Sequence, residues 1–244
     1  MRATEPMTSV WRLARRRLPL AMRADAVELL DGGSLSLPEI EQNLADLARL
    51  NRLPGGTSAS VDGIRRLIGG GADGRILDVG TGRADMPLAF AERGWRTTGL
   101  DSNPDVLLVA RRETAAQPLV EIVAGDGRSL PFDADSFDVA HASLFVHHFG
   151  PAEVVAILGE LRRVARRGVV INDLRRGLVP LLATGASVLA FGRSRVTWSD
   201  GLASVRRSYT LAELDELLAE AGLRIRWRSS RWQPRVVTAA SVGA

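Results

Sequence analysis

The sequence contains neither cysteine nor lysine, and it has one tyrosine among its 244 residues. Without cysteine the chain can form no disulfide, no thiolate metal site and no cysteine nucleophile. No apolar run approaches the roughly 18–20 residues that a membrane-spanning helix needs. No long apolar segment follows the N-terminal arginines, as a secretory signal would require. We therefore expect a cytoplasmic protein without a transmembrane segment.

The absence of lysine also explains the sequence pI of about 10.9. All 32 basic residues are arginine, and almost no group titrates between the pKa values of histidine and arginine. A net charge of +4 is therefore enough to give this high pI. Residues 1–23 and 224–244 each carry +5, which leaves residues 24–223 at −6 (+4 less +5 at each end). The arginine-rich ends are candidates for contacts with nucleic-acid phosphates, and the N-terminal arm also for a peripheral membrane contact.

Predicted strands and helices alternate from Arg75 onward, which indicates βαβ units and a parallel sheet. The length favours one large α/β domain. A hairpin ends the chain, because two strand patterns are joined by a short connection through Pro234. The predicted strands are 76–79, 97–101, 120–124, 137–145, 169–173, 223–228 and 235–240, and the predicted helices between them are 85–93, 104–115, 151–166 and 211–221.

Two segments stand outside this alternation. Ser36 and Glu39 form a capping-box pattern ahead of a helix that reaches Leu50, and a second helix is predicted at 60–68. Residues 177–192 carry no charge, and this apolar segment is either a lid over the site or a plain core or dimer helix. The expected organisation is a basic arm (1–23), a helical cap (24–74) and a core (75–244) with a lid-like insertion (174–208). The side chains expected to form the lid are Leu178, Val179, Leu181, Leu182, Val188, Leu189 and Phe191.

Three acids, Asp78, Asp101 and Asp126, stand at the ends of three successive predicted strands. The Gly80-Thr81-Gly82 turn after the first strand lets a ligand approach the backbone closely. An acid after the second strand can hold both ribose hydroxyls of a nucleoside, and Asp126 can accept from an adenine amino group. The pattern predicts a nucleoside-binding crevice.

The residues around the glycines select the nucleoside cofactor. A pyrophosphate favours a third glycine and no acid beside the loop, but Asp78 precedes the glycines, Ala84 follows them and Asp85 opens the helix. Asp78 repels a diphosphate and attracts an ammonium or a sulfonium. S-adenosylmethionine carries both cations and no phosphate, so it is the expected cofactor, and we expect no metal.

Together these residues resemble the class I S-adenosylmethionine-dependent methyltransferases over about residues 72–244. The resemblance implies a Rossmann-like α/β fold with a seven-stranded, mostly parallel sheet and an antiparallel last strand. Ala84 departs from the family, which often has glycine there. The chain looks most like the ubiquinone/menaquinone-biosynthesis methyltransferases, and residues 43–53 are also similar to a bacterial group often found beside type III polyketide synthases. The matching residues are 76–82, Asp101, Asp126, 130–132 and 137–139.

The resemblance implies a role for each matching position. Gly80 and Gly82 would lie against the methionine part of the cofactor, and Asp78 near its amino group. Asp101 would bind the ribose hydroxyls and Asp126 the adenine amino group. The full set of expected cofactor-binding residues is Asp78, Gly80, Thr81, Gly82, Asp101, Ser102, Asp126, Gly127 and Ser143.

Methyl transfer is an in-line displacement, so the protein mainly aligns the reactants and excludes water. A hydroxyl acceptor can be helped by one general base. His147 and His148 follow the fourth strand and are the candidate catalytic residues; alternatively, they pack against the cofactor or cap the next helix. His141, inside the strand, is expected in the core. Asn172 and Asp173 are further candidates on the acceptor side.

We predict a methyltransferase of secondary metabolism that methylates a small apolar or aromatic, phenolic or polyketide-like acceptor at oxygen. Three alternatives remain: C-methylation of a quinone-like precursor, methylation of RNA through the arginine-rich ends, and a non-catalytic cofactor-binding protein. The expected partner is the small-molecule acceptor and not a nucleic acid, and the expected state is a monomer or homodimer.

Overall fold

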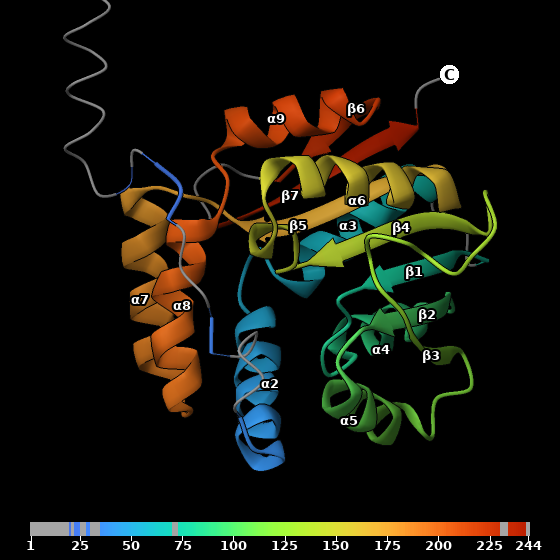
Figure 1. The fold of residues 1–244 in the computed structure, drawn as a ribbon. Helices are drawn as coiled ribbons and strands as arrows, with labels where there is room; N and C mark the ends of the chain where they lie inside the picture. Colours follow the sequence, from blue (N-terminus) through green and yellow to red (C-terminus); the bar gives the residue numbers. More distant parts are fainter. Residues whose placement is uncertain are drawn as a thin grey trace, which may run out of the picture.

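The structure is a computed structural model that describes residues 20, 22–24, 28–29, 35–69, 73–229 and 234–242. Most of the predicted basic arm lies outside the described residues. A seven-stranded sheet in the order β3-β2-β1-β4-β5-β7-β6 forms the centre of the molecule (Figure 1). Only β7 is antiparallel to its neighbours, β5 and β6. The predicted sheet is therefore confirmed. Its strands are β1 (Arg75–Val79), β2 (Arg96–Asp101), β3 (Val120–Ala124), β4 (Phe137–Ser143), β5 (Ala165–Leu174), β6 (Leu223–Arg228) and β7 (Arg235–Val242).

Helices cover both faces of the sheet (Figure 1). Ile76 packs with the cluster of α3 and α4, whereas Leu77 and Val79 pack with the cluster of α6 and α9. Because both faces are buried, the central strands have apolar residues at successive positions. The helices on the first face are α3 (Thr57–Ile68), α4 (Asp85–Ala91) and α5 (Pro104–Thr114); those on the second are α6 (Pro151–Val164) and α9 (Leu211–Glu220).

Several strand boundaries differ from the prediction, and those of β4 and β5 bear on the site. β4 ends at Ser143 and not at residue 145, because Leu144 adopts a left-handed conformation with φ 51°. The 3-10 turn η2 (Val146–His148) follows it. β5 is longer than predicted and extends over Ala165–Leu174, since β4 pairs with it from Ala165 and β7 pairs with it as far as Leu174.

Three helices stand beside the carboxyl edge of the sheet: α2 (Leu37–Asn51), α7 (Leu178–Phe191) and α8 (Arg195–Arg207) (Figure 1). Helix α2 begins with the predicted capping box. Asp46 of α2 is fully buried and accepts hydrogen bonds of 2.7 Å from the backbone N–H groups of Arg193 and Ser194, at the start of α8. The insertion after β5 is thus tied to the N-terminal helix. Helix α3, in contrast, packs on the sheet itself.

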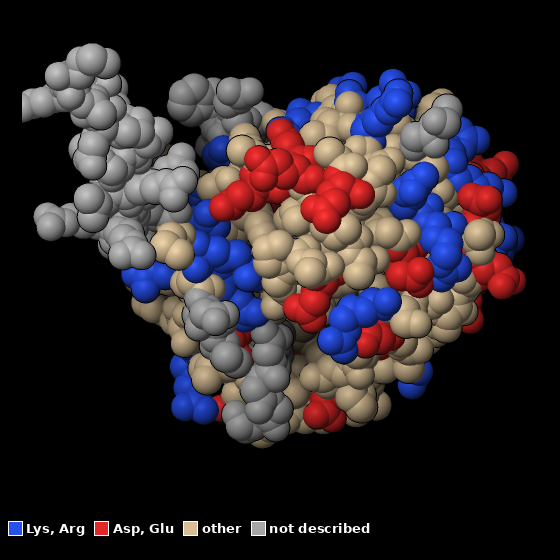
Figure 2. Space-filling view, turned by 45° about the horizontal axis from the view of Figure 1, so that its top comes forward, with Lys and Arg blue, Asp and Glu red and all other residues tan. Residues whose placement is uncertain are grey.

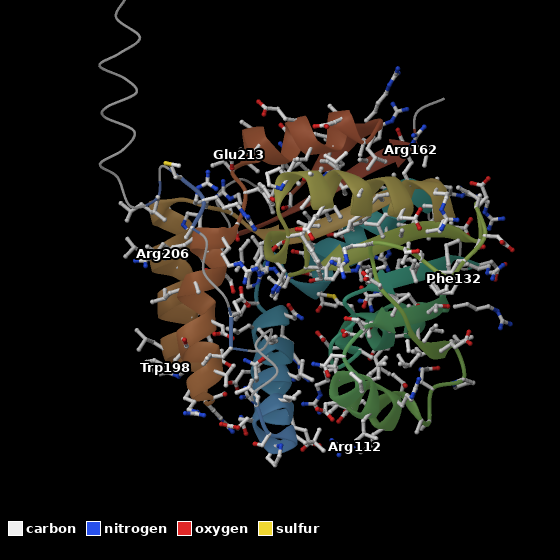
Figure 3. All side chains as sticks on the ribbon, viewed as in Figure 1. Arg112, Phe132, Arg162, Trp198, Arg206 and Glu213 are labelled. Atoms are coloured by element: carbon white, nitrogen blue, oxygen red, sulfur yellow. The ribbon has the colours of Figure 1, made fainter. Side chains whose placement is uncertain are left out.

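The predicted apolar lining of the insertion is wrong for most of its residues. Pro180, Thr184 and Val188 are the buried residues of α7. The nearly uniform apolar sequence of this helix hid which side faces inward, because without charged residues it has no clear amphipathic face. Trp198 of α8 also points away from the molecule (Figure 3). The exposed α7 residues are Leu178, Val179, Leu182, Leu189 and Phe191. In the described part of the chain, no helix is both long and apolar enough to cross a membrane.

Candidate active site

One cavity of about 460 Å³ lies between the carboxyl ends of the strands and helices α2, α7 and α8. Parallel α/β sheets bind their ligands at this edge, and the volume falls within the roughly 300–1,000 Å³ usual for small-molecule sites. All eleven residues predicted for cofactor and catalysis line it: Asp78, Gly80, Thr81, Gly82, Asp101, Ser102, Asp126, Gly127, Ser143, His147 and His148.

The turn after β1 is held against β2 and against the segment after β4. The N–H groups of Gly80 and Thr81 both donate to the carbonyl oxygen of Leu100. Gly80 has φ +70°, and a Cβ there would lie 2.4 Å from the Phe145 ring. Ala84 also adopts a left-handed conformation, with φ 66°. The family's usual glycine would fit that conformation more easily than alanine does.

Asp78 is buried and already holds two partners. Its Oδ1 lies 2.6 Å from His141 Nδ1, and its Oδ2 accepts a 2.8 Å hydrogen bond from Thr81. The other ring nitrogen of His141 lies 2.9 Å from the Ser60 hydroxyl. His141 is fully buried, and it links the carboxylate at the turn to helix α3.

The two other predicted acids differ in their surroundings. Asp101 accepts hydrogen bonds from the backbone N–H groups of Gly82 (3.2 Å) and Asn103 (3.0 Å), while burial raises its pKa. Asp126 is partly exposed and pairs with Arg128 at 2.8 Å, which lowers its pKa. The ribose candidate is thus enclosed, whereas the adenine candidate lies at the cavity mouth.

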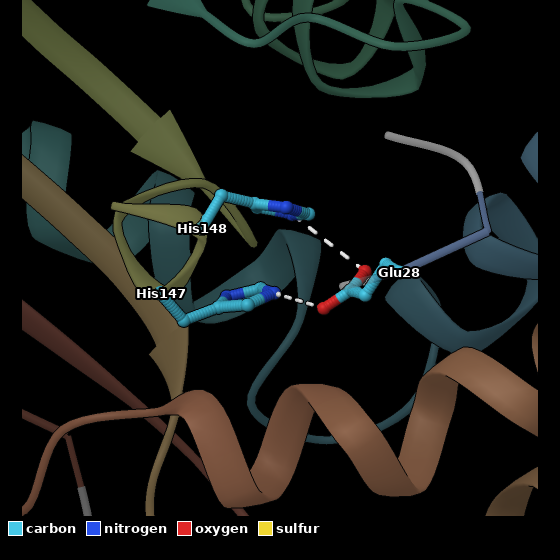
Figure 4. Close-up of side chains that lie close together, drawn as sticks. All are labelled: Glu28, His147 and His148. Atoms are coloured by element: carbon cyan, nitrogen blue, oxygen red, sulfur yellow. Dashed lines mark ion pairs between the residues drawn. The ribbon is translucent and has the colours of Figure 1, made fainter. Parts of the chain in front are cut away.

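His147 is buried between two carboxylates. Its Nδ1 lies 2.6 Å from Asp173 Oδ1, and its Nε2 lies 3.4 Å from Glu28 Oε1 (Figure 4). Burial alone would lower the pKa of His147, but the two carboxylates outweigh it and raise the pKa to about 9. His147 is therefore an imidazolium at neutral pH.

His148 stacks beside His147 with ring centroids 4.3 Å apart, and its Nε2 lies 3.8 Å from Glu28 Oε2 (Figure 4). The ligand atoms of Glu28, His147 and His148 lie within 4.8 Å of one another and could surround a metal ion. Arg207 also lies 3.7 Å from Glu28, so a divalent cation there would compete with a guanidinium. The geometry favours an ion-pair cluster.

Asn172 and Asp173 do not line the main cavity. Asp173 lies behind His147 and orients its ring. Asn172 is fully buried, donates to Ser60 and Gly56, and accepts from Arg235. Both residues support the cavity wall, so their predicted placement on the acceptor side is wrong.

Sequence reasoning missed Arg235 and Asn51, which both line the cavity. Arg235 donates to Asn51, to Asn172 and to Ser143. Asn51 in turn donates to Asp85 at 2.8 Å. These pairs are far apart in the chain, and no motif spacing points to them. Glu28 was missed for the same reason.

Comparison with known proteins assigns the domain. A methyltransferase domain model matches residues 77–171, which hold the glycine turn, Asp101 and Asp126. This matched segment covers less than half of the chain and contains strands that end at the cavity. The chain is similar to demethylmenaquinone methyltransferases, with 37% identity over 116 residues to that of Clavibacter sepedonicus (46% of this chain, 45% of the relative). The Thermus thermophilus protein is 37% identical over 97 residues (38% of this chain, 43% of the relative). The match thus spans less than half the length of either relative.

Solved methyltransferase structures share the fold. An S-adenosylmethionine-dependent methyltransferase from Aquifex aeolicus aligns with a TM-score of 0.60 and 17% identity, covering 86% of this chain and all (100%) of the other. Magnesium protoporphyrin IX methyltransferase from Synechocystis, with bound S-adenosylhomocysteine, aligns with a TM-score of 0.58 and 15% identity over 97% of this chain and 95% of the other. At these identities the likeness concerns the fold alone.

Proposed function

We propose that this methyltransferase transfers the methyl group of S-adenosylmethionine to a small, largely apolar acceptor that carries a hydroxyl group. One observation carries the proposal: a single cavity joins the three strand-end acids to an apolar wall and a histidine pair. Apolar lining with a few convergent polar groups is typical of a small-molecule site. The apolar wall consists of Leu47, Leu50, Leu53, Phe149 and Val188.

The polar groups and glycines that line the cavity fit this cofactor. Asp101 is the proposed partner of the ribose hydroxyls, and Asp126 that of the adenine amino group. Gly80 and Gly82 bring the backbone against the methionine part, with Asp78 on the side of its cationic groups. The bound cofactor supplies a methyl group on a cationic sulfur, which is the electrophile of the reaction.

The histidine pair is the proposed proton acceptor for the hydroxyl. The acceptor oxygen forms its bond to the methyl carbon as the carbon–sulfur bond breaks, and the hydroxyl proton must leave. His147 is already protonated, so His148 is the candidate base. When His148 accepts the proton, its positive charge is balanced by the carboxylate of Glu28. His147 keeps Glu28 anionic beside it.

O-methylation is the first proposal, and C-methylation of a quinone-like ring is the second. The relatives' name, demethylmenaquinone methyltransferase, favours the second. A phenol must lose the same proton in either case, so the histidine pair serves both. Product analysis separates them, because a methoxy group and a ring methyl have different carbon shifts in NMR.

The test is methyl transfer from isotope-labelled S-adenosylmethionine to a panel of phenols and hydroquinones, followed by mass spectrometry. We expect a labelled small-molecule product with the wild type. Asp101→Ala should weaken cofactor binding in calorimetry by about tenfold or more, since two hydrogen bonds to a charged group are lost. If the wild type binds no cofactor, the proposed function is wrong; if it binds the cofactor without methylating any small molecule, the non-catalytic alternative gains.

A further inference from the structure

The guanidinium of Arg235 lies in the cavity wall and is buried, with 6% of the residue exposed. Its three hydrogen bonds go to neutral oxygens: Nε donates to Asn172 at 3.0 Å, Nη2 donates to the Ser143 hydroxyl at 2.7 Å, and Nη1 donates to Asn51. No carboxylate of the described residues lies within ion-pair distance of it. Burying a charge without a directly paired opposite charge is costly. Burial lowers the pKa of Arg235 to about 10, although the carboxylates of Asp173 and Asp85, beyond ion-pair distance, act in the opposite direction.

The other basic side chains that line the cavity are already paired with carboxylates. Arg83 pairs with Glu113 at 2.8 Å, and Arg128 pairs with Asp126 at 2.8 Å. The two histidines face Glu28 and, for His147, Asp173. Among the described lining residues, Arg235 is therefore the cation left for an anionic ligand group.

The neighbours of Arg235 place it at one end of the cofactor cleft. Ser143 ends β4, next to β1 in the sheet, and Phe145 packs against Gly80 of the glycine turn. On the other side, Asn51 connects Arg235 to Asp85, where α4 begins after that turn. The ribose and adenine candidates, Asp101 and Asp126, follow β2 and β3 on the opposite side of β1. Arg235 is thus on the side of the glycine turn where the methionine part would extend.

We propose that Arg235 binds the α-carboxylate of the methionine part of S-adenosylmethionine. This proposal rests on the proposed function, since it concerns the same cofactor. A guanidinium with a fixed orientation matches a carboxylate well, and the three neutral oxygens fix this one before the ligand arrives. The negative group of the zwitterion would then meet Arg235, while its two cations face Asp78 and Asp85.

The test compares S-adenosylmethionine with its decarboxylated form by calorimetry. The decarboxylated ligand carries one more net positive charge, so in a cavity lined by Asp78, Asp85 and Asp101 it should otherwise bind at least as tightly. We expect the wild type to prefer S-adenosylmethionine by about ten- to a hundredfold, the usual range for a hydrogen bond to a charged group.

Arg235→Met should abolish or reverse the preference. Arg235→Lys should keep part of it, because lysine retains the charge but not the planar guanidinium that donates two parallel hydrogen bonds to a carboxylate. Arg176→Met is the matched control: Arg176 is also buried, but it pairs with Glu213 and does not line the cavity. It should leave the preference unchanged. Since the preference is a ratio within one protein, partial destabilisation does not alter it.

Equal binding of the two ligands by the wild type, or an unchanged ratio in Arg235→Met, would overturn the proposal. If Arg235→Met does not fold, the wild-type preference and the Arg235→Lys ratio decide. If neither ligand binds the wild type, the proposed function itself fails, which is a different result.

Discussion

The surroundings of the His147 imidazole change its pKa. Asp173 of β5 and Glu28 face its two nitrogens, His148 stacks on it, and Arg23 donates to its backbone carbonyl. The carboxylates favour the charged ring more than burial disfavours it, so the pKa rises from 6.5 to about 9. The proton on His147 therefore stabilises the folded state.

This shift predicts how stability depends on pH. The folded pKa lies above the unfolded one, so the contribution is fully present below pH 6.5 and is lost as the pH rises through about 9. We expect the free energy of unfolding to fall by about 3 kcal/mol across this window. Urea denaturation at several pH values measures it. His147→Gln should be less stable at pH 6.5 and should lose most of the slope, and an equal slope in both proteins would contradict the assignment.

Gly80 gives a second prediction at the scale of one residue. Alanine there needs φ +70° and places a Cβ 2.4 Å from the Phe145 ring. Gly80→Ala should destabilise the fold by about 2 kcal/mol or more and weaken cofactor binding. Gly159→Ala is the matched control, because nothing lies within 4 Å of its Cβ in the middle of α6. It should stabilise by up to about 1 kcal/mol. Thermal and urea unfolding compare the two, and similar losses would contradict the steric argument.

At the scale of elements, α2 and the insertion after β5 form one wall of the cavity. Asp46 joins them, because its carboxylate accepts from the first N–H groups at α8 and also pairs with Arg49. Although burial alone would raise the pKa of Asp46, these N–H donors lower it. Asn43 donates to Thr197 of α8 at 3.0 Å, one turn earlier along α2.

Asp46→Asn should therefore loosen α2 from α8. We expect a loss of about 1–3 kcal/mol, since an amide is a weaker acceptor and can turn its N–H groups toward backbone donors. Urea denaturation measures the loss, and the acceptor KM should rise if the wall shifts. Asp62→Asn, on an exposed position of α3, should change stability by less than about 0.5 kcal/mol. Equal effects of the two changes would show that Asp46 does not hold the wall.

At the scale of the whole molecule, arginine and acidic side chains are interspersed on the face shown in Figure 2. The C-terminal arginines belong largely to the β6–β7 hairpin: Arg228 pairs with Asp215, Arg226 bonds to Ser241, and Arg235 is buried. These C-terminal arginines are thus part of the sheet. In the described part of this segment the arginines do not form a separate arm, and methylation of RNA through the arginine-rich ends stays an alternative to be tested.

Salt dependence provides the corresponding test. The kcat/KM for methylation of a small acceptor should change by less than about threefold between about 50 and 200 mM salt. Salt screens interactions between solvent-exposed charges, and few such interactions bring a small acceptor to the enzyme. An RNA substrate bound through 6–10 phosphates would lose about 10³–10⁵ in affinity over the same range. Steady-state kinetics with both substrate classes measures this, and a steep salt response would favour the RNA alternative.

The sequence by itself determined the alternating elements, the parallel sheet with its antiparallel last strand, and the edge at which Asp78, Asp101 and Asp126 meet. These follow from local patterns, because strand ends, caps and glycine turns depend on neighbouring residues. Only the tertiary structure decided the inward side of α7, the burial of Asn172, and the pairing of Arg235 with Asn51. Each of these depends on segments far apart in the chain, whose contacts arise from packing and leave no spacing that a motif can reveal.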